Sequence, residues 1–491
     1  MAHSASSHNS MPRTAGRGSK PARADRRDSN GRAGGHGGAN QHRRRSNDVR
    51  GGMPADEPRD GMHRGSTHDT RRDRTHGSTA RSTRAERHPG PCPIKQACGG
   101  CEWIGVPYRK QLARKQAAME ELFGPLIEEA GWDAGVAPIV GMGPRDAQAR
   151  VPYTPFGYRH KAASPFAPGP HGTIESGFFA RGTHRIVACP ACAVEAGGAR
   201  RILNETAAIA SRLGIAAYDE DRRRGLVRYA VVRMGWRTDE AMLTLVTSNR
   251  DIPHVSELVE QLRAIDSRIV TIAQNINPRQ TNAILGGETR ILYGAERMRD
   301  RLLGCTFEIS PTSFYQTNPQ QTEVLYQLAI DGLELQANDV LIDAYCGSGT
   351  IGLTAADAAR SRGAAVELIG IERNASGIRD ARRNARINDL EGIARFIADD
   401  ATAYLQRAAA DGLQADALIM DPPRAGSTPE FLAAACAIGP RRVAYISCNP
   451  ITQARDLADL ARGGYRLRSL TPVDMFPHTS HTETVAILER A

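Results

Sequence analysis

The C-terminal part of the sequence predicts an α/β fold whose open central sheet is mostly parallel. A glycine-rich loop stands between an apolar strand pattern and a helical pattern, and apolar runs then alternate with helical patterns up to the C-terminus. The last two runs are close enough to form a hairpin. Seven strands are predicted, over 339–345, 367–372, 395–398, 417–420, 442–447, 468–473 and 484–488.

Composition divides the 491-residue chain into three predicted parts. Residues 1–90 carry 19 Lys and Arg against 9 Asp and Glu, whereas the rest of the chain carries 45 of each, so the net charge of +10 belongs to this tail. The tail has no aromatic residue and almost no large aliphatic residue, which predicts disorder. We expect a β-rich region with a cysteine cluster over 91–312 and the α/β domain over 313–491.

The composition of the basic tail leaves two interpretations open. Mixtures of arginine and glycine can hold a phosphate backbone loosely and in a salt-dependent way, and the same composition suits a solubilising or spurious extension. No run of the chain approaches the roughly 18 apolar residues of a membrane helix, and its start lacks the apolar core of a signal peptide. We therefore expect a cytosolic protein.

Nine cysteines in a cytosolic chain are not expected to form a disulfide framework. Cys92, Cys98 and Cys101 follow the spacing C-x5-C-x2-C, and two glycines precede the third. Three close thiolates and one remote thiolate suit a [4Fe-4S] cluster, although the C-x2-C pair also suits a structural zinc site. Both Cys189 and Cys192 qualify as the fourth ligand.

The glycine-rich loop indicates a nucleotide-type cofactor. Gly347, Gly349 and Gly352 satisfy G-x-G-x-x-G between a strand and a helix, a motif that NAD-binding proteins also carry. Glu372 ends the next strand, where it can accept hydrogen bonds from ribose hydroxyls. Asp343, just before the glycines, would repel a pyrophosphate but can pair with a cationic amino-acid moiety. This favours S-adenosylmethionine (SAM), which carries an ammonium and a sulfonium and no phosphate, and the strand layout is that of a class I methyltransferase.

Three further segments at strand ends carry candidate catalytic residues. Cys448 follows the run 442–447, where open α/β sheets bind their ligands, and the alternative is a small core residue. Asp421 begins an Asp-Pro-Pro-Arg segment, whose prolines either direct Asp421 and Arg424 into the crevice or simply form a rigid turn. Glu483 precedes the terminal strand, as a functional carboxylate or as a solvated loop acid.

Together, these segments resemble the SAM-dependent RNA 5-methyluridine (uracil-C5) methyltransferases, the family of the 23S rRNA and tRNA uracil-C5 enzymes. The likeness runs from about Cys92 to the C-terminus, and so many ordered motifs are not expected to co-occur by chance. The segments that carry it are 92–101, 177–180, 184–187, 274–277, 313–318, 343–350, 421–424, 447–450 and 481–483.

The resemblance implies a role for each matching residue. Cys448 falls on the family's nucleophile, Glu483 on its general base and Asp421 on the residue that contacts the uracil edge. Cys192 falls on the fourth cluster ligand, although the proline that the family has directly after this cysteine follows Cys189 here. The SAM-binding positions fall on Gln316, Asp343, Tyr345, Gly347, Gly349, Glu372, Asp400 and Asp421.

These roles fit the chemistry of uracil. Its C5 is not nucleophilic enough to attack a methyl sulfonium unaided, and addition of a thiolate to C6 places electron density on C5. A base must then remove the C5 proton so that the thiol can leave, which needs two groups such as Cys448 and Glu483. The target uridine must be unstacked or flipped out to reach such a pocket. The iron-sulfur centre is expected to be structural, because these steps transfer no electron.

The expected partner is RNA. We favour 23S rRNA over tRNA, because the cysteine cluster goes with the rRNA branch of the family. Many members carry a small N-terminal β-barrel, and here we expect the basic tail in its place to provide part of the RNA contact. Residues 158–161 are either a further RNA contact or an ordinary strand end. We expect a monomer.

Three other functions stay open. An amino-group N-methyltransferase also uses an acidic-Pro-Pro motif and needs no nucleophile. An RNA 5-methylcytosine enzyme uses cysteine, but the Pro-Cys motif expected there is absent. A non-catalytic RNA-binding or assembly protein on a methyltransferase scaffold would not need Cys448, Glu483 and the glycine loop together.

Overall fold

The structure, a computed structural model, describes residues 92–143 and 154–491. The tail predicted to be disordered, residues 1–90, lies outside the described residues. All described residues belong to one compact unit, which contains two large sheets. No helix in this part of the chain is long and apolar enough to span a bilayer.

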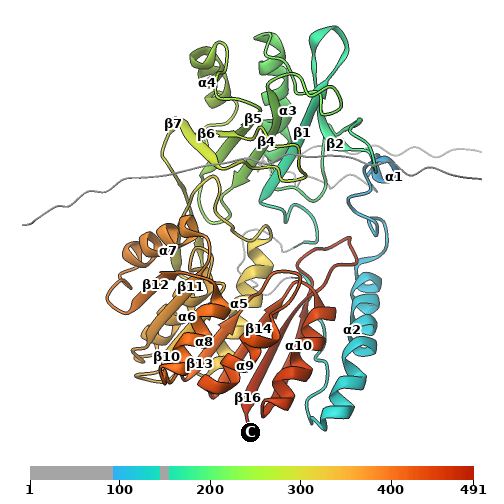
Figure 1. Cartoon of the computed structure of the whole chain (residues 1–491). Helices are drawn as coiled ribbons and strands as arrows, with labels where there is room; N and C mark the ends of the chain where they lie inside the picture. The colour runs from blue at the N-terminus through green and yellow to red at the C-terminus, as the bar shows by residue number, and fades with distance from the viewer. Residues whose placement is uncertain (1–91, 144–153) are drawn as a thin grey trace, which may run out of the picture. The chain divides into compact units, whose positions relative to one another are not determined.

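The first sheet has the strand order β3-β2-β1-β4-β5-β6-β7 (Figure 1). Its neighbouring strands are antiparallel, except for the parallel pair β5 and β6. Helices α3 and α4 pack on the sheet and bury an aliphatic core. The elements of this region are α1 (Lys95–Cys98), α2 (Tyr108–Ala130), β1 (Lys161–Pro168), a 3-10 turn (Pro170–Gly172), β2 (Ile174–Phe179), β3 (Ile186–Ala188), α3 (Ala199–Arg212), β4 (Val227–Met234), β5 (Ala241–Thr247), α4 (Val255–Arg263), β6 (Ile269–Ile276), β7 (Glu288–Gly294) and the hairpin of β8 (Met298–Leu302) and β9 (Cys305–Ile309).

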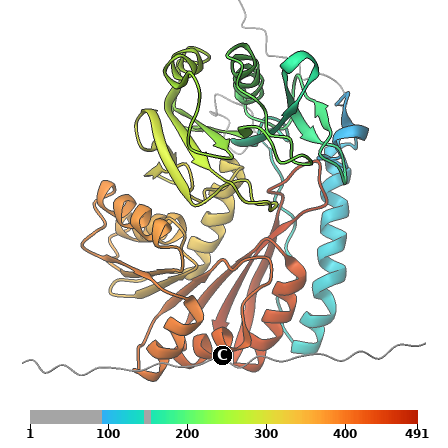
Figure 2. The ribbon, with the colours of Figure 1, turned by 45° about the horizontal axis from the view of Figure 1, so that its top comes forward.

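The second sheet confirms the predicted seven-stranded α/β architecture. Its order is β12-β11-β10-β13-β14-β16-β15, with five parallel strands and an antiparallel hairpin at one edge. Helices cover both of its faces (Figure 2). The elements are α5 (Pro319–Leu333), β10 (Val340–Ala344), α6 (Thr350–Ser361), β11 (Glu367–Glu372), α7 (Ala375–Ile387), β12 (Ala394–Ala398), α8 (Ala401–Ala410), β13 (Ala417–Met420), α9 (Pro429–Ile438), β14 (Arg442–Ser447), α10 (Pro450–Arg462), β15 (Tyr465–Val473) and β16 (Glu483–Arg490).

The strand order determines where a ligand can bind. From β10 the chain proceeds to one side through β11 and β12, and then returns to the other side of β10 with β13 and β14. The connections that leave the carboxyl ends of β10 and β13 therefore diverge, and open α/β sheets bind ligands in the crevice formed at such a point. Strand β13 is buried along its whole length, as expected for a parallel strand that is covered on both faces.

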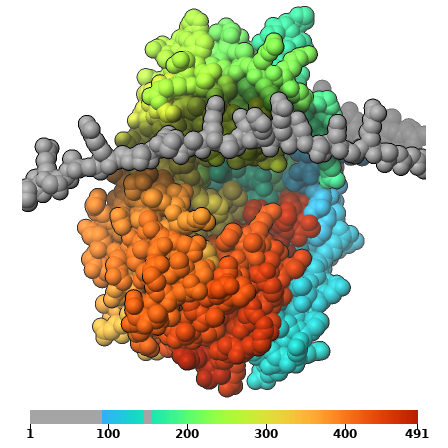
Figure 3. All heavy atoms as spheres, in the orientation of Figure 1, coloured from blue at the N-terminus to red at the C-terminus, as the bar shows by residue number. Residues whose placement is uncertain are grey.

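Helix α2 packs on the second sheet although it precedes the first sheet in the chain. Met119 and Phe123 of α2 belong to the same buried cluster as side chains of β13, β14 and α10, and Phe123 is fully buried. Figures 1 and 3 show α2 lying along the C-terminal segment that carries α10. The boundary at residue 312 stays a prediction, and the core of the second sheet includes residues from well before it.

A buried ion pair attaches α2 to the loop between β15 and β16. Lys115 Nζ donates to Asp474 Oδ1 over 2.6 Å, and neither side chain is exposed. The same ammonium also donates to the carbonyl oxygens of His481 (2.6 Å) and Phe476 (3.2 Å). Tyr108 Oη donates to the other oxygen of Asp474 over 2.7 Å. Every hydrogen of the ammonium thus has an acceptor, which is the condition under which a buried charge is tolerated.

Replacement of Lys115 by methionine is expected to lower the free energy of unfolding by roughly 3–5 kcal/mol, because the Asp474 carboxylate would stay buried without its cation. The matched control is Lys110→Met on an exposed position of the same helix, with an expected change below about 0.5 kcal/mol. Urea denaturation would measure both changes. The double variant Lys115→Met, Asp474→Leu should recover part of the loss. Equal stabilities of Lys115→Met and Lys110→Met would show that the pair does not hold the loop.

Candidate active site

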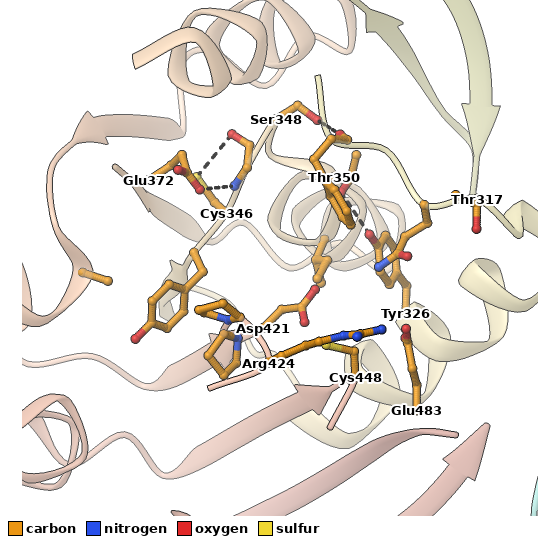
Figure 4. Close-up of a pocket in the computed structure, with 18 of the residues that line it drawn as sticks. Thr317, Tyr326, Cys346, Ser348, Thr350, Glu372, Asp421, Arg424, Cys448 and Glu483 are labelled. Carbon is orange, nitrogen blue, oxygen red and sulfur yellow. Dashed lines mark hydrogen bonds between the residues drawn. The ribbon is translucent and has the colours of Figure 1, made fainter. Parts of the chain in front are cut away.

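The crevice at the carboxyl ends of the parallel strands contains a cavity of about 800 Å³. The parts of the chain that line it include the ends of β10, β11, β13 and β14, the start of β16, segment 314–317, α5 and the start of β1. Figure 4 shows the side chains that converge there. Of the residues predicted from the sequence, the cavity wall includes Gln316, Tyr345, Gly347, Glu372, Asp400, Asp421, Cys448 and Glu483.

Asp343 is buried behind the wall of this cavity. Its carboxylate is 1% exposed, and Oδ2 accepts the backbone N–H of Gly352 at the start of α6 over 2.9 Å. A Cβ at Gly352 would lie 2.7 Å from that oxygen, so glycine permits the close approach. Oδ1 of Asp343 has no hydrogen-bond partner. Burial, with repulsion from Asp421 and Glu372, raises the pKa of Asp343 to about 8.

The backbone of the loop after β10 leaves open space beside Gly347. Tyr345 has a φ of +65°, and Gly347 has a φ of +57°. A Cβ at Gly347 would meet no atom within 4 Å, whereas one at Gly349, which is packed behind the wall, would lie 3.1 Å from Leu353. Glu372 Oε2 accepts the N–H of Gly347 over 3.2 Å, which fixes the loop against β11. An open glycine next to carboxylates, one of them with an unpaired oxygen, fits a cationic cofactor such as SAM.

The three predicted catalytic residues lie together on one side of the cavity. Cys448 directly follows β14 and is partly exposed, and Asp421 directly follows β13. Glu483 is the first residue of β16 and is 4% exposed, so it is not a solvated loop acid. Figure 4 shows the side chain of Arg424 extending past Asp421 and Cys448 towards Glu483. The amide of Asn449 donates to the carbonyl oxygen of Arg424 over 2.8 Å, which joins the two strand-end segments.

Electrostatics in the site favour neutral carboxyl groups and a weakly acidic thiol. Burial and the neighbouring Asp421 raise the pKa of Glu483 to about 8, while Arg424 opposes the rise. Burial alone raises the pKa of Asp421 to about 7. The pKa of the Cys448 thiol is raised by burial and by the two carboxylates, and the positive charge of Arg424 acts in the opposite direction. Arg424 is thus the cation that favours both the thiolate and the carboxylate forms.

Tyr326 is a polar residue of the site that was not predicted from the sequence. Tyr326 of α5 lines the cavity, is 2% exposed and has its hydroxyl 3.1 Å from Oγ1 of Thr350. Burial raises the pKa of its hydroxyl, and the nearby Asp421, Asp343 and Glu483 add to the rise. In the sequence Tyr326 stands in a helical pattern with apolar neighbours, and nothing there distinguishes it from a core aromatic residue.

The clustered cysteines surround a second, smaller cavity. Its wall contains five thiols, from Cys92, Cys98, Cys101, Cys189 and Cys192. Burial raises the pKa of the Cys98 and Cys101 thiols, and the nearby Cys192 adds to the rise of both. Cys189 is 2% exposed, and its sulfur is 3.4 Å from the carbonyl oxygen of Ala191. Within residues 92–143 and 154–491, no three Cys, His, Asp or Glu side chains are grouped as ligands of a single metal ion.

Comparisons with known proteins agree with this site. Residues 257–491 match the family described as tRNA (uracil-5-)-methyltransferase. An uncharacterized RNA methyltransferase of Halalkalibacterium halodurans is 37% identical over 406 residues, which cover 82% of this chain and 84% of that protein. This chain belongs to the RNA uracil-C5 methyltransferase family. An uncharacterized RNA methyltransferase of Staphylococcus aureus is 36% identical over 398 residues, with 81% of this chain and 83% of that protein covered.

A solved structure extends the comparison to the fold. The Pyrococcus abyssi tRNA (uracil-54, C5)-methyltransferase, in complex with S-adenosyl-L-homocysteine (SAH), matches with a TM-score of 0.62 and 26% identity, over 79% of this chain and 85% of that one. The class I SAM methyltransferase fold and SAM dependence are thereby confirmed for this methyltransferase, as is its membership of a family that acts on RNA.

Stability is expected to depend on pH through the buried carboxyl groups. The folded-state pKa values of Glu483 and Asp343 (about 8) and of Asp421 (about 7) lie above their unfolded-state values. Their contribution to stability is therefore fully present below about pH 4 and is lost as the pH rises to about 8. Glu483→Gln removes this ionisation, so it should exceed the parent in free energy of unfolding by about 1–3 kcal/mol near pH 8 and little near pH 5.

Urea denaturation of the parent and of Glu483→Gln at both pH values measures this effect. Glu430→Gln, at an exposed position in the first turn of α9, is the control and should show no such pH-dependent gain. A difference between Glu483→Gln and the parent that is the same at both pH values would contradict a raised pKa of Glu483.

Proposed function

We propose that this methyltransferase transfers the methyl group of SAM to C5 of a uridine through a covalent adduct between Cys448 and C6 of the uracil ring. The observation that supports this proposal is the convergence of Cys448, Asp421, Glu483 and Arg424 on one wall of a cavity that also includes the glycine loop. An N-methyltransferase has no use for a thiol at this place. The adduct mechanism uses all four side chains.

Cys448 performs the first step. Its thiolate forms a bond to C6 of uracil, and the electron pair of the C5–C6 double bond moves onto C5 and the C4 carbonyl oxygen. The positive charge of Arg424 favours the thiolate and lies where it can offset the charge that develops on the ring. Bound SAM would supply an electrophilic methyl group, which C5 accepts while the bond between that methyl and the sulfonium breaks.

Glu483 performs the last step. Its carboxylate takes the proton from C5, the C5–C6 double bond forms again, and the bond from C6 to Cys448 breaks to release the thiolate. Asp421 is proposed to contact the N3–H edge of the base, for which its carboxyl at the end of β13 is suitably placed. Phe314 is 69% exposed and lines the same cavity, which supports stacking of a base at its mouth.

For SAM we propose the residues of the glycine loop and its neighbours. The unpaired oxygen of Asp343 would favour the ammonium side of the cofactor, and Glu372, whose oxygens bind Gly347 N–H and Asn374 N–H, retains lone pairs for ribose hydroxyls. Asp400 caps α8 through the N–H of Ala403 and lines the cavity beside it, as an adenine-side residue would. Gln316, Tyr345 and Gly349 keep the cofactor roles predicted for them.

The proposal also extends to the class of RNA that carries the target uridine. We propose 23S rRNA, on the ground of the cysteine cluster, and the second candidate is tRNA, which is favoured by the solved relative that acts on tRNA. The cytosolic location, the monomeric state and a contribution of the tail to RNA binding stay predictions from the sequence.

A trapped adduct tests mechanism and substrate together. RNA that contains 5-fluorouridine, incubated with enzyme and SAM, should give a shifted band on a denaturing gel, because fluorine at C5 cannot leave as a proton. The band should require SAM and disappear in Cys448→Ala, while Cys436→Ala, at a partly buried site on α9, should keep it. Glu483→Gln should accumulate the adduct even with ordinary uridine.

The RNA that is offered decides the substrate in the same experiment. Fragments of 23S rRNA and total tRNA are incubated separately, and a band with tRNA alone would replace our substrate proposal by the second candidate. Methylation of uridine by Cys448→Ala at the parental rate would overturn the covalent mechanism.

We also propose that the cavity of five thiols holds a [4Fe-4S] cluster through Cys92, Cys98, Cys101 and Cys192. The supporting observation is that cysteines from two distant segments of the chain surround one cavity, with Cys192 close to Cys98 and Cys101. Cysteine thiolates are the ligands of such a cluster, one for each of its irons. The cluster would hold the segment of residues 92–101 to the first sheet.

Iron and acid-labile sulfide in anaerobically purified protein test the cluster. We expect about four of each per chain, loss of most of the iron in Cys192→Ser and retention of the iron in Cys189→Ser, which is the matched control. Stoichiometric zinc without iron would overturn the cluster in favour of a structural zinc site. Loss of iron in Cys189→Ser alone would move the fourth ligand to Cys189.

A further inference from the structure

Two cationic side chains lie directly opposite each other where the first sheet meets the active-site cavity. Lys161 begins β1, and its partner in the antiparallel pairing with β4 is Arg233. Both line a small cavity together with Gln316, and Lys161 also lines the active-site cavity, as does Arg159. The N–H of His160, between Arg159 and Lys161, donates to the carbonyl oxygen of Thr317 over 2.7 Å, which attaches this end of β1 to the rim of the active site.

The side chains of Lys161 and Arg233 lack the carboxylate partners that other buried arginines near the first sheet have. Arg200 and Arg228, 5% and 3% exposed, each bind a carboxylate with two nitrogens, Glu195 and Glu220 respectively. Arg233 is 4% exposed, and no carboxylate of the described residues lies within 4 Å of its guanidinium or of the Lys161 ammonium. The Nε atoms of Arg233 and Arg159 have no hydrogen-bond partner.

The acidic side chain that shares the small cavity does not neutralise Lys161 and Arg233. Asp300 shares the small cavity, but its Oδ1 accepts the backbone N–H groups of Trp236, Arg237 and Arg301. The influences on the pKa of Lys161 are repulsion by Arg233 and burial, which together lower it to about 7. Like charges directly opposite each other in a sheet destabilise it. The arrangement therefore costs folding free energy unless an anion is bound.

A structural role explains Arg233 only in part and does not explain Lys161. One terminal nitrogen of Arg233 donates to the carbonyl oxygen of Ser313 and so holds the segment that leads to Phe314 and Gln316. Lys161 has no such bond within the described residues. Its ammonium is thus the group that an incoming ligand can engage without breaking an existing contact.

We propose that Lys161, supported by Arg233 behind it and Arg159 beside it, binds a backbone phosphate of the RNA strand that brings the uridine into the cavity. The inference rests on the proposed function. A nucleotide that is flipped into a pocket carries its own phosphates to the rim of that pocket. A lysine contacts a phosphate as a point charge and fixes the register of the strand without reading its sequence.

The test measures the binding of a uridine-containing RNA stem-loop at several salt concentrations to the full chain and to Lys161→Met. Loss of one phosphate contact should reduce the slope of log Kobs against log[salt] by about 0.7 and weaken binding about fivefold at 0.1 M salt. The matched control, Lys110→Met on the exposed face of α2, should bind as the parent does. Lys161→Met should melt at or above the parental temperature, because it removes a repulsion.

A second arm identifies the phosphate. The stem-loop is made with a neutral methylphosphonate on either side of the target uridine, and one of the two should weaken the parent while weakening Lys161→Met no further. Full additivity of the two changes, or a parental salt slope in Lys161→Met, would overturn the proposal. A weaker affinity of Lys161→Met for SAH would overturn it in favour of a contact to the cofactor's carboxylate.

Failure of this proposal is distinguishable from failure of the proposed function. The parent preparation is tested for transfer of labelled methyl from SAM to the same RNA. Methylation by the parent together with unchanged RNA binding by Lys161→Met overturns the phosphate site alone. Absence of any RNA binding by the parent overturns both.

Discussion

The buried ion pair between Lys115 and Asp474 is the constraint on which the active site depends. The ammonium contacts the loop between β15 and β16 at three points, Asp474, Phe476 and His481, and Glu483 follows two residues after the last of them. The position at which β16 begins, and hence the place of the Glu483 carboxyl in the cavity, is set by a helix that precedes the first sheet. The ion pair between Lys115 and Asp474 acts mainly by fixing the loop, because a hydrophobic pair of the same volume would stabilise the fold equally well.

The cavity that this loop completes is electrostatically costly without its ligands. Asp421 and Glu483 line it and Asp343 is buried behind its wall, while Arg424 is the cation that acts on Glu483 and Cys448. Lys161, which also lines this cavity, and its strand partner Arg233 form the opposite imbalance, because neither has a carboxylate partner among the described residues. A positively charged cofactor would complement the carboxyl groups, and a negatively charged nucleic acid strand would complement Lys161 and Arg233. Sites that bind and react are commonly less stable than the fold would otherwise allow.

Much of the fold followed from the sequence because it depends on local patterns. All seven strands of the second sheet were predicted, and the five parallel ones are recognisable because buried parallel strands are continuous apolar runs. Eight predicted residues line one cavity because strand ends meet at one edge of the sheet. The burial of Glu483 was not predictable, because it depends on Lys115 from a remote segment. The pairing of Lys161 with Arg233 depends on strand register, and Tyr326 resembles a core residue. The segment 274–277 has buried amides that bind neighbouring strands and loops, as Gln274 binds Thr247 over 2.7 Å, so its part in the family resemblance is structural.

The contact between α2 and the loop between β15 and β16 also determines when the fold of this enzyme can be completed during its synthesis. Lys115 and Asp474 are 359 residues apart in the chain. At typical translation rates of about 5–20 residues per second, the helix waits on the order of 20–70 seconds for its partner to leave the ribosome. Until α10 has been made, the apolar side chains of α2, Phe123 among them, lack part of the native surface that covers them. The nascent methyltransferase therefore presents an amphipathic helix with an uncovered apolar face for most of its translation, and the carboxyl of Glu483 is positioned only when the strands β15 and β16 have been made.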